Sequence, residues 1–277
     1  MSNLLIHSMA EFSDIITSAL EIADARQICE IGAEFGGMSQ ILADHAQAVA
    51  GGLTSIDPAP KPEFLNWAAA SDQVTHVALP SLEGIGGLRN IDAWLIDGDH
   101  NWYTVYHELN AVQAACERDG KPMLAFLHDV AWPCARRDFY YAPDQIPAEF
   151  RHPYDYRGGA VPGDAGLLPN RGFRGMGQFA LAEIEGGPRN GVKTAVEDFT
   201  AERFAAGHDL AYAEIPAVFG LGILFDVDAP WSAALAELVM PYHQNRLIAA
   251  LEANRLANYL AVLDWQDRTN EAKKQAA

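Results

Sequence analysis

Short apolar runs alternate with helix-like segments through the first half of the chain. Apolar side chains at close to helical spacing predict a helix over residues 9–24, ahead of the core. Alternation of strands and helices at this interval predicts an α/β fold, with a Rossmann-like, doubly wound sheet that is mostly parallel and covered on both faces. Five strands are expected in the runs ARQICEI, LTSIDP (53–58), VTHVALP (74–80), AWLIDGDH (93–100) and MLAFLHD (123–129).

The second half of the chain supplies the elements that close this sheet. A helical pattern covers residues 190–204, and Asn190 is a candidate N-cap for it. Two further apolar runs, near 209–215 and 218–226, bring the expected strands to seven.

Residues 131–190 differ from the rest, because they are rich in Pro, Gly, Arg and Tyr and lack periodicity. Eight aromatic residues lie between Trp132 and Phe173, which argues against disorder. A segment of this length inside a domain is usually functional. We therefore expect an ordered insertion after the fifth strand, placed to cover a bound substrate.

The C-terminal segment is long and amphipathic from Trp231 to about Asp267. Its heptad-like spacing fits a helix packed on its own domain, and it also fits one that pairs two protomers into a homo-oligomer. The sequence thus divides into an α/β domain over 1–230 and a helical extension over 231–277.

Charge and cysteine content narrow the classes of partner. With 19 Lys and Arg against 37 Asp and Glu, the formal charge of −18 repels phosphate backbones and anionic lipids, so neither nucleic acid nor a membrane is expected as a partner. Three cysteines form no CxxC pair and indicate a reducing compartment. No leader pattern and no apolar run of about 20 residues is apparent, so we expect a cytoplasmic protein that acts on a small molecule.

A glycine-rich turn follows the first strand and precedes a helix. Its pattern is acid-x-Gly-x-x-x-Gly, where glycine lets the backbone turn tightly and approach a nucleoside. Asp57 ends the next strand, 25 residues beyond Gly32, where a carboxylate can accept both hydroxyls of a ribose. The residues expected to bind the cofactor are therefore Glu30, Gly32, Ala33, Glu34, Gly36 and Asp57.

The local charge of this turn favours S-adenosylmethionine (SAM) over NAD. A dinucleotide site usually has G-x-G-x-x-G and free amides for a pyrophosphate. Here Glu34 stands where that anion would approach. A carboxylate suits the cationic sulfonium and ammonium groups of SAM better.

The segments EIGAEFGG, SIDP, LIDGDHNWYTVYHEL and FLHD resemble those of class I SAM-dependent methyltransferases. The similar branch contains macrocin-type sugar O-methyltransferases and relatives of cephalosporin-hydroxylase methyltransferases. The resemblance covers about residues 25–130. It implies that Glu30, Gly32 and Gly36 form the first SAM motif, that Asp57 binds ribose, and that residues 1–230 form a methyltransferase domain.

The same resemblance implies roles for the polar residues at the ends of strands four and five. Asp97 is expected to serve both catalysis and the cofactor, and His100 is the candidate base. Asp97, His128 and Asp129 are candidate ligands of a divalent metal ion, with Asp99 as a further one. The resembled metal users carry a carboxylate at the position of His128, and magnesium prefers oxygen ligands, so a transition ion and a metal-free site both stay open.

Arg136, Arg137, Tyr140 and Tyr141 lie just after the fifth strand and are candidates to grip a hydroxylated substrate. A salt-bridged lid without ligand contacts is the alternative reading of this cluster. Together these features predict a SAM-dependent O-methyltransferase that acts on a sugar or a glycosylated natural-product intermediate. An NAD-dependent α/β enzyme and a non-catalytic SAM- or nucleoside-binding protein are the alternatives.

Overall fold

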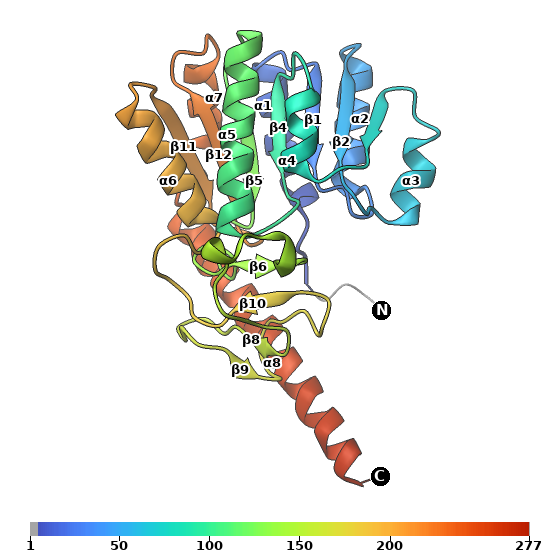
Figure 1. Ribbon diagram of the computed structural model, residues 1–277, viewed down its shortest axis with the longest axis vertical. Coiled ribbons are helices and arrows are strands. Elements are labelled where there is room, and N and C mark those ends of the chain that lie inside the picture. The colour runs from blue at the N-terminus through green and yellow to red at the C-terminus, as the bar shows by residue number, and fades with distance from the viewer. Residues whose placement is uncertain (1–4, 277) are drawn as a thin grey trace.

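A seven-stranded sheet forms the centre of the protein in the computed structural model, which describes residues 5–276 and the side chains up to residue 272 (Figure 1). The strands lie in the order β11-β12-β5-β4-β1-β2-β3. Their bounds are β1 Gln27–Ile31, β2 Gly52–Ile56, β3 Val74–Val77, β4 Ala93–Ile96, β5 Leu124–His128, β11 Leu210–Ile215 and β12 Leu221–Asp226. The expected Rossmann-like, doubly wound sheet of seven strands is thus confirmed.

Strand direction and order define where a ligand can enter. Strands β1 to β5 are parallel, whereas β12 runs antiparallel to both β5 and β11. The order of the strands reverses between β1 and β4, so the connections after these two strands leave the sheet on opposite faces. In such sheets a crevice opens outside the carboxyl ends at this switch point.

Helices cover both faces of the sheet. One face carries α1, α2 and α7, and the other carries α4, α5 and α6 (Figure 1). Side chains of β5 alternate between the two layers: Leu124 and Phe126 pack on the first face, Ala125 and Leu127 on the second. The helix bounds are α1 Ser13–Ile22, α2 Gly37–Ala48, α3 Pro62–Ala68, α4 Ser81–Gly84, α5 Trp102–Asp119, α6 Val192–Ala205, α7 Ser232–Val239 and α8 Arg246–Ala276.

The helix expected over 9–24 begins as a 3-10 turn at Met9–Phe12 and continues as α1. Asn190 does not cap α6 as expected, because the N-cap is Gly191. The amide of Asn190 donates instead to the carbonyls of Ile184 and Gly186. Two short helices, α3 and α4, were not anticipated from the sequence.

The insertion lies between β5 and α6, beyond the carboxyl ends of the strands (Figure 1). Its strands are too short for a visible period: β6 Phe139–Tyr140, β7 Tyr154–Asp155, β8 Gly158–Gly159, β9 Leu168–Pro169 and β10 Ala180–Ala182. They form a three-stranded sheet, β6-β10-β7, and a hairpin, β8-β9. The insertion is therefore folded, with backbone pairing of its own, and it lies beyond the carboxyl ends of the strands.

The C-terminal pattern forms two helices, not one. Pro241 lies between α7 and α8, where proline cannot donate the hydrogen bond that would continue a helix. α7 packs on α1, and α8 runs from the sheet past the insertion (Figure 1). Arg171 and Arg174 of the insertion pair with Asp264 and Asp267 of α8, each at 2.7 Å, so α8 packs on its own chain.

The sequence predicts free cysteines and no membrane-spanning helix. Cys29, Cys116 and Cys134 are all buried and unpaired. Among residues 5–276, no helix combines the length and the apolarity needed to cross a bilayer.

Glu108 is a fully buried carboxyl group on α5, and neither of its oxygens has a hydrogen-bond partner among the described residues. Burial outweighs the opposing effect of the nearby Ser81 hydroxyl and raises the pKa of Glu108 to about 8, and the charge of Asp99 adds a smaller contribution. The folded protein therefore holds a proton that the unfolded chain has already lost at neutral pH. Because the native state binds more protons, the free energy of unfolding falls as pH rises toward 8.

We expect Glu108→Gln to remove this component of the pH dependence. Relative to the variant, wild-type protein should lose up to ~1.4 kcal/mol of stability per pH unit between pH 5 and 8. Chemical denaturation across this range measures the difference. Glu117→Gln, at an exposed position of the same helix, is the control and should follow wild type. Parallel profiles for Glu108→Gln and wild type would contradict the assignment.

Candidate active site

The loop after β1 approaches the end of β4 so closely that only glycine fits at residue 32. Gly32 has a φ of +90°, and an added Cβ would overlap the carbonyl oxygen of Asp97 and lie 2.6 Å from the Cα of Gly98. Gly36, the N-cap of α2, has a φ of +84° in the left-handed region. The two glycines thus wrap the loop around the crevice between β1 and β4.

Glu30 was expected to bind the cofactor, but the structure gives it another role. Its side chain is 3% exposed, and Oε2 accepts from the hydroxyls of Ser39 at 2.5 Å and Ser55 at 3.0 Å. Burial raises the pKa of Glu30 to about 7, although both hydroxyl bonds oppose the shift. Glu30 ties α2 and β2 together beneath the loop and positions the loop from below.

Asp57 supports the same loop from its side. Oδ2 accepts from the amides of Ala33 at 2.9 Å and Glu34 at 3.2 Å, and Oδ1 accepts from Ala59 at 2.8 Å. A carboxylate offers about four acceptor sites, so roughly one remains, on Oδ1. The expectation that Asp57 accepts both ribose hydroxyls is therefore reduced to one hydroxyl.

Asp97, His100 and Asp129 converge at the carboxyl ends of β4 and β5. Nε2 of His100 lies 2.8 Å from Oδ2 of Asp129 and 3.3 Å from Oδ1 of Asp97. One ligand atom from each of the three residues lies within 4.8 Å of the others. Asp129 reaches this position with a φ of +59°, which turns the chain sharply after β5. This trio can hold a cation or polarise a bound hydroxyl group.

His128 was expected in the metal set, but it stands behind the trio. Its Nε2 bonds the carbonyl of Val218 at 2.9 Å, and its Nδ1 lies 3.2 Å from Oδ1 of Asp97. A carbonyl and a carboxylate only accept, so both ring nitrogens carry hydrogen. The ring is therefore a cation that orients Asp97, and His100 takes its place among the converging groups.

The charges in this cluster shift one another's pKa values. Burial works against ionisation of Asp97, yet the charge of His128 and bonds from both imidazoles lower the pKa of Asp97 to about 2. Burial also opposes the charged form of His128, and Asp97 and Asp129 overcome it to raise its pKa to about 9. The same two carboxylates outweigh burial at His100 and raise its pKa well above the usual value.

Asp99 was a further candidate ligand, but its oxygens are occupied. Oδ2 accepts from Asn101 at 2.7 Å and from Thr104 at 3.0 Å, and Oδ1 accepts from the amide of His100. Burial raises the pKa of Asp99 despite these bonds. Asp99 thus holds the turn into α5 and is removed from the ligand set.

Three of the four candidate substrate residues are used within the protein. Arg136 makes two 2.6 Å bonds to Glu197 of α6. Arg137 is fully buried and donates to backbone carbonyls, and Tyr140 is 1% exposed and donates to Asp138. Burial leaves Arg137 and Tyr140 out of a substrate contact set, whereas Arg136 is partly exposed and stays a candidate.

Tyr141 remains the candidate substrate residue that faces the site. Its side chain is 54% exposed, and its ring centroid lies 6.4 Å from that of His100. Phe139, which the sequence analysis did not single out, packs against both rings at 4.8 and 5.3 Å. Val218 was missed as well, because its carbonyl reaches His128 from a turn 90 residues away, and no sequence pattern marks that contact.

Comparison with known proteins gives distant structural similarity. No family model and no curated protein matches the chain. The SAH-bound methyltransferase PaMTH1 of Podospora anserina is 14% identical, with 80% of each chain covered and a TM-score of 0.47. The O-methyltransferase of Bacillus cereus in complex with SAH is also 14% identical, with 81% of this chain and 85% of that chain covered and a TM-score of 0.47. At this distance neither protein assigns a residue or an activity here.

Gly32→Ala tests the close approach at the crevice. A Cβ at this position meets backbone at Asp97 and Gly98, and the φ of +90° is strained for alanine, so the loop must move. We expect a loss of ~2 kcal/mol or more in the free energy of unfolding, measured by chemical denaturation. Gly37→Ala is the matched control, because a Cβ there meets nothing within 4 Å. Equal stability of the two variants would contradict the geometry.

Proposed function

We propose that the protein is a SAM-dependent O-methyltransferase that acts on a small polyhydroxylated acceptor of the sugar type. One observation carries this proposal: the Gly32 loop, supported by Asp57, lies directly against Asp97, which belongs to a cluster of carboxylates and imidazoles. A nucleoside site and a site for proton removal therefore meet at the switch point of the sheet. Methyl transfer to a hydroxyl group requires both.

The bonds within the loop favour SAM over NAD. A dinucleotide needs free amides at the turn to receive its pyrophosphate. Here the amides of Ala33 and Glu34 are already taken by Oδ2 of Asp57, and the exposed carboxylate of Glu34 stands at the same turn. An anion would be repelled there, whereas the cationic methionine portion of SAM would be attracted.

The cluster supports transfer and argues against a purely binding protein. As the methyl group passes from sulfur to the acceptor oxygen, the acceptor hydroxyl loses its proton. We assign this proton to the carboxylates of Asp97 and Asp129 and not to His100, the base expected from the sequence, because Nε2 of His100 already donates to both carboxylates and the raised pKa keeps that ring protonated. A binding protein would have no need to hold two carboxylates against two imidazoles in a half-buried crevice.

The donor set fits a divalent metal ion. Two carboxylates with an imidazole nearby are ligands that suit a transition ion better than magnesium. In this proposal Asp97 and Asp129 hold the ion, and His128 keeps Asp97 in position. When bound, such an ion would polarise the acceptor oxygen and lower the pKa of its hydroxyl group.

SAM binding should depend on Asp57, which supports the loop and offers one acceptor site to the ribose. We expect calorimetry to show SAM binding and no NAD binding, and Asp57→Ala to weaken SAM at least ~10-fold, about 1.4 kcal/mol. Asp72→Ala, an exposed acid ahead of β3 at the opposite edge of the sheet, serves as control. Unchanged SAM affinity in folded Asp57→Ala would remove Asp57 from the site.

Chelation tests the ion separately from the cofactor. We expect EDTA to abolish methyl transfer and an added divalent transition ion to restore it, while SAM binding persists, because the sulfonium needs no metal. His100→Ala should lower turnover by ~10-fold or more under all conditions, because the two carboxylates lose the imidazolium that orients them. His208→Ala, an exposed histidine, is the control. Full turnover in EDTA would eliminate the ion and leave the carboxylates of Asp97 and Asp129 as the only proton acceptors.

A further inference from the structure

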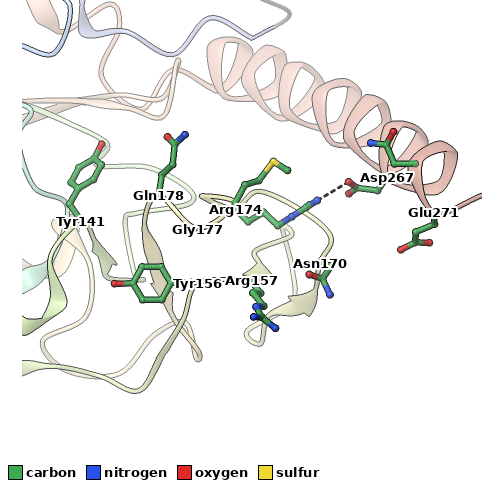
Figure 2. Close-up of a pocket in the computed structure, with 11 residues that line it drawn as sticks. Tyr141, Tyr156, Arg157, Asn170, Arg174, Gly177, Gln178, Asp267 and Glu271 are labelled. Carbon is green, nitrogen blue, oxygen red and sulfur yellow. Dashed lines mark hydrogen bonds and ion pairs between the residues drawn. The ribbon is translucent and has the colours of Figure 1, made fainter. Parts of the chain in front are cut away.

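A pocket of about 930 Å³ opens between the insertion and α8, next to the candidate active site (Figure 2). Its wall is polar and carries few aliphatic side chains. Ordinary small-molecule pockets are lined mostly by apolar groups, with only a few polar ones. The polar side chains that matter here are Tyr141, Tyr156, Arg157, Asn170, Gln178 and Asn270.

The chemistry of this wall indicates a ligand covered with hydroxyl groups. Asn170, Gln178 and Asn270 each offer an amide that both donates and accepts hydrogen bonds. The phenols of Tyr141 and Tyr156 add hydroxyls and flat apolar faces on which the C–H face of a sugar ring can lie. Sugar rings present both kinds of surface at once.

The pocket begins at the site of chemistry. Tyr141 lines it at one end, and the ring of the same residue lies 6.4 Å from that of His100. Figure 2 shows Tyr141 at one side of the pocket and Asp267 and Glu271 of α8 at the other. A molecule whose reacting hydroxyl lies at His100 would therefore extend away from the sheet, toward α8.

Ion pairs hold the pocket wall that α8 forms against the insertion, and Arg157 in the same pocket has a guanidinium that can bind a ligand. Arg174 pairs with Asp267 at 2.7 Å, and Arg171 pairs with Glu271 at 2.8 Å, which fixes α8 against the insertion. Arg157, by contrast, is exposed and has no acidic partner among the residues that the structure describes. Its guanidinium can bind ligand oxygens without first breaking an ion pair.

We propose that this pocket is an acceptor subsite that binds a glycosidic chain beyond the ring that is methylated. Its volume is near the upper end of the range of about 300–1,000 Å³ that is common for ligand sites, which exceeds the need of one sugar ring. This inference rests on the proposed function and refines it. The acceptor is a chain of at least two sugar rings, not a free monosaccharide.

Calorimetry on the full-length protein loaded with SAH tests the subsite. The probes are a panel of neutral and uronate-containing trisaccharides, each paired with its constituent monosaccharides. We expect at least one trisaccharide to bind ~10-fold or more tightly than its monosaccharides. Tyr156→Ala and Arg157→Ala should each weaken it ~10-fold while SAH affinity stays unchanged. Arg268→Ala removes an exposed arginine of α8 that does not line the pocket, and it should bind as wild type.

The outcomes separate the two proposals. SAH binding without trisaccharide binding, or equal trisaccharide affinity in wild type and both pocket variants, overturns the subsite and leaves the methyltransferase proposal standing. Failure of SAM and SAH to bind contradicts the proposed function, and the subsite with it.

Discussion

The reversal of strand order between β1 and β4 determines where the candidate site forms. The connections after these two strands leave on opposite faces, and two segments of the chain meet at the carboxyl edge between them. The Gly32 loop comes from one side and Asp97 from the other, so close that a Cβ at Gly32 has no room. Because of this contact, any molecule held by the loop lies beside the carboxylates that end β4 and β5. The proposed transfer chemistry follows from that adjacency.

Electrostatic balance keeps the cluster intact away from bulk water. Asp97 and Asp129 would repel each other in a half-buried crevice, but His100 and His128 lie between or behind them as cations. In the insertion, a buried carboxylate is stabilised by backbone amides and not by imidazoles. This residue, Asp138, receives the amides of Trp102 and Gly191, each at 2.7 Å, and so links α5, the insertion and α6. The hydrogen bonds of Asp138 are made within the protein, and they hold the insertion that carries Tyr141 in place.

The central sheet and the position of the site could be predicted from the sequence, but the roles of several site residues could not. Buried parallel strands are continuous apolar runs, and the polar residue after each run marks the carboxyl edge. Arg137 and Tyr140 were expected to contact substrate because their burial could not be predicted from the sequence. The strands that bury them have only two or three residues, too few to show an alternation of apolar and polar positions. His128 orients Asp97 and does not join the metal set as expected, because the carbonyl of Val218, far along the chain, fixes its ring. His100 lies among the converging groups in its place. The break between α7 and α8 had a visible signal in Pro241.

A crystal structure of the protein with SAH would locate the cofactor and the cluster together. We expect adenosine on the Gly32 loop, with one ribose hydroxyl bonded to Oδ1 of Asp57 and the sulfur facing the trio of Asp97, His100 and Asp129. SAH bound elsewhere, or with its sulfur directed away from these three residues, would contradict this expectation.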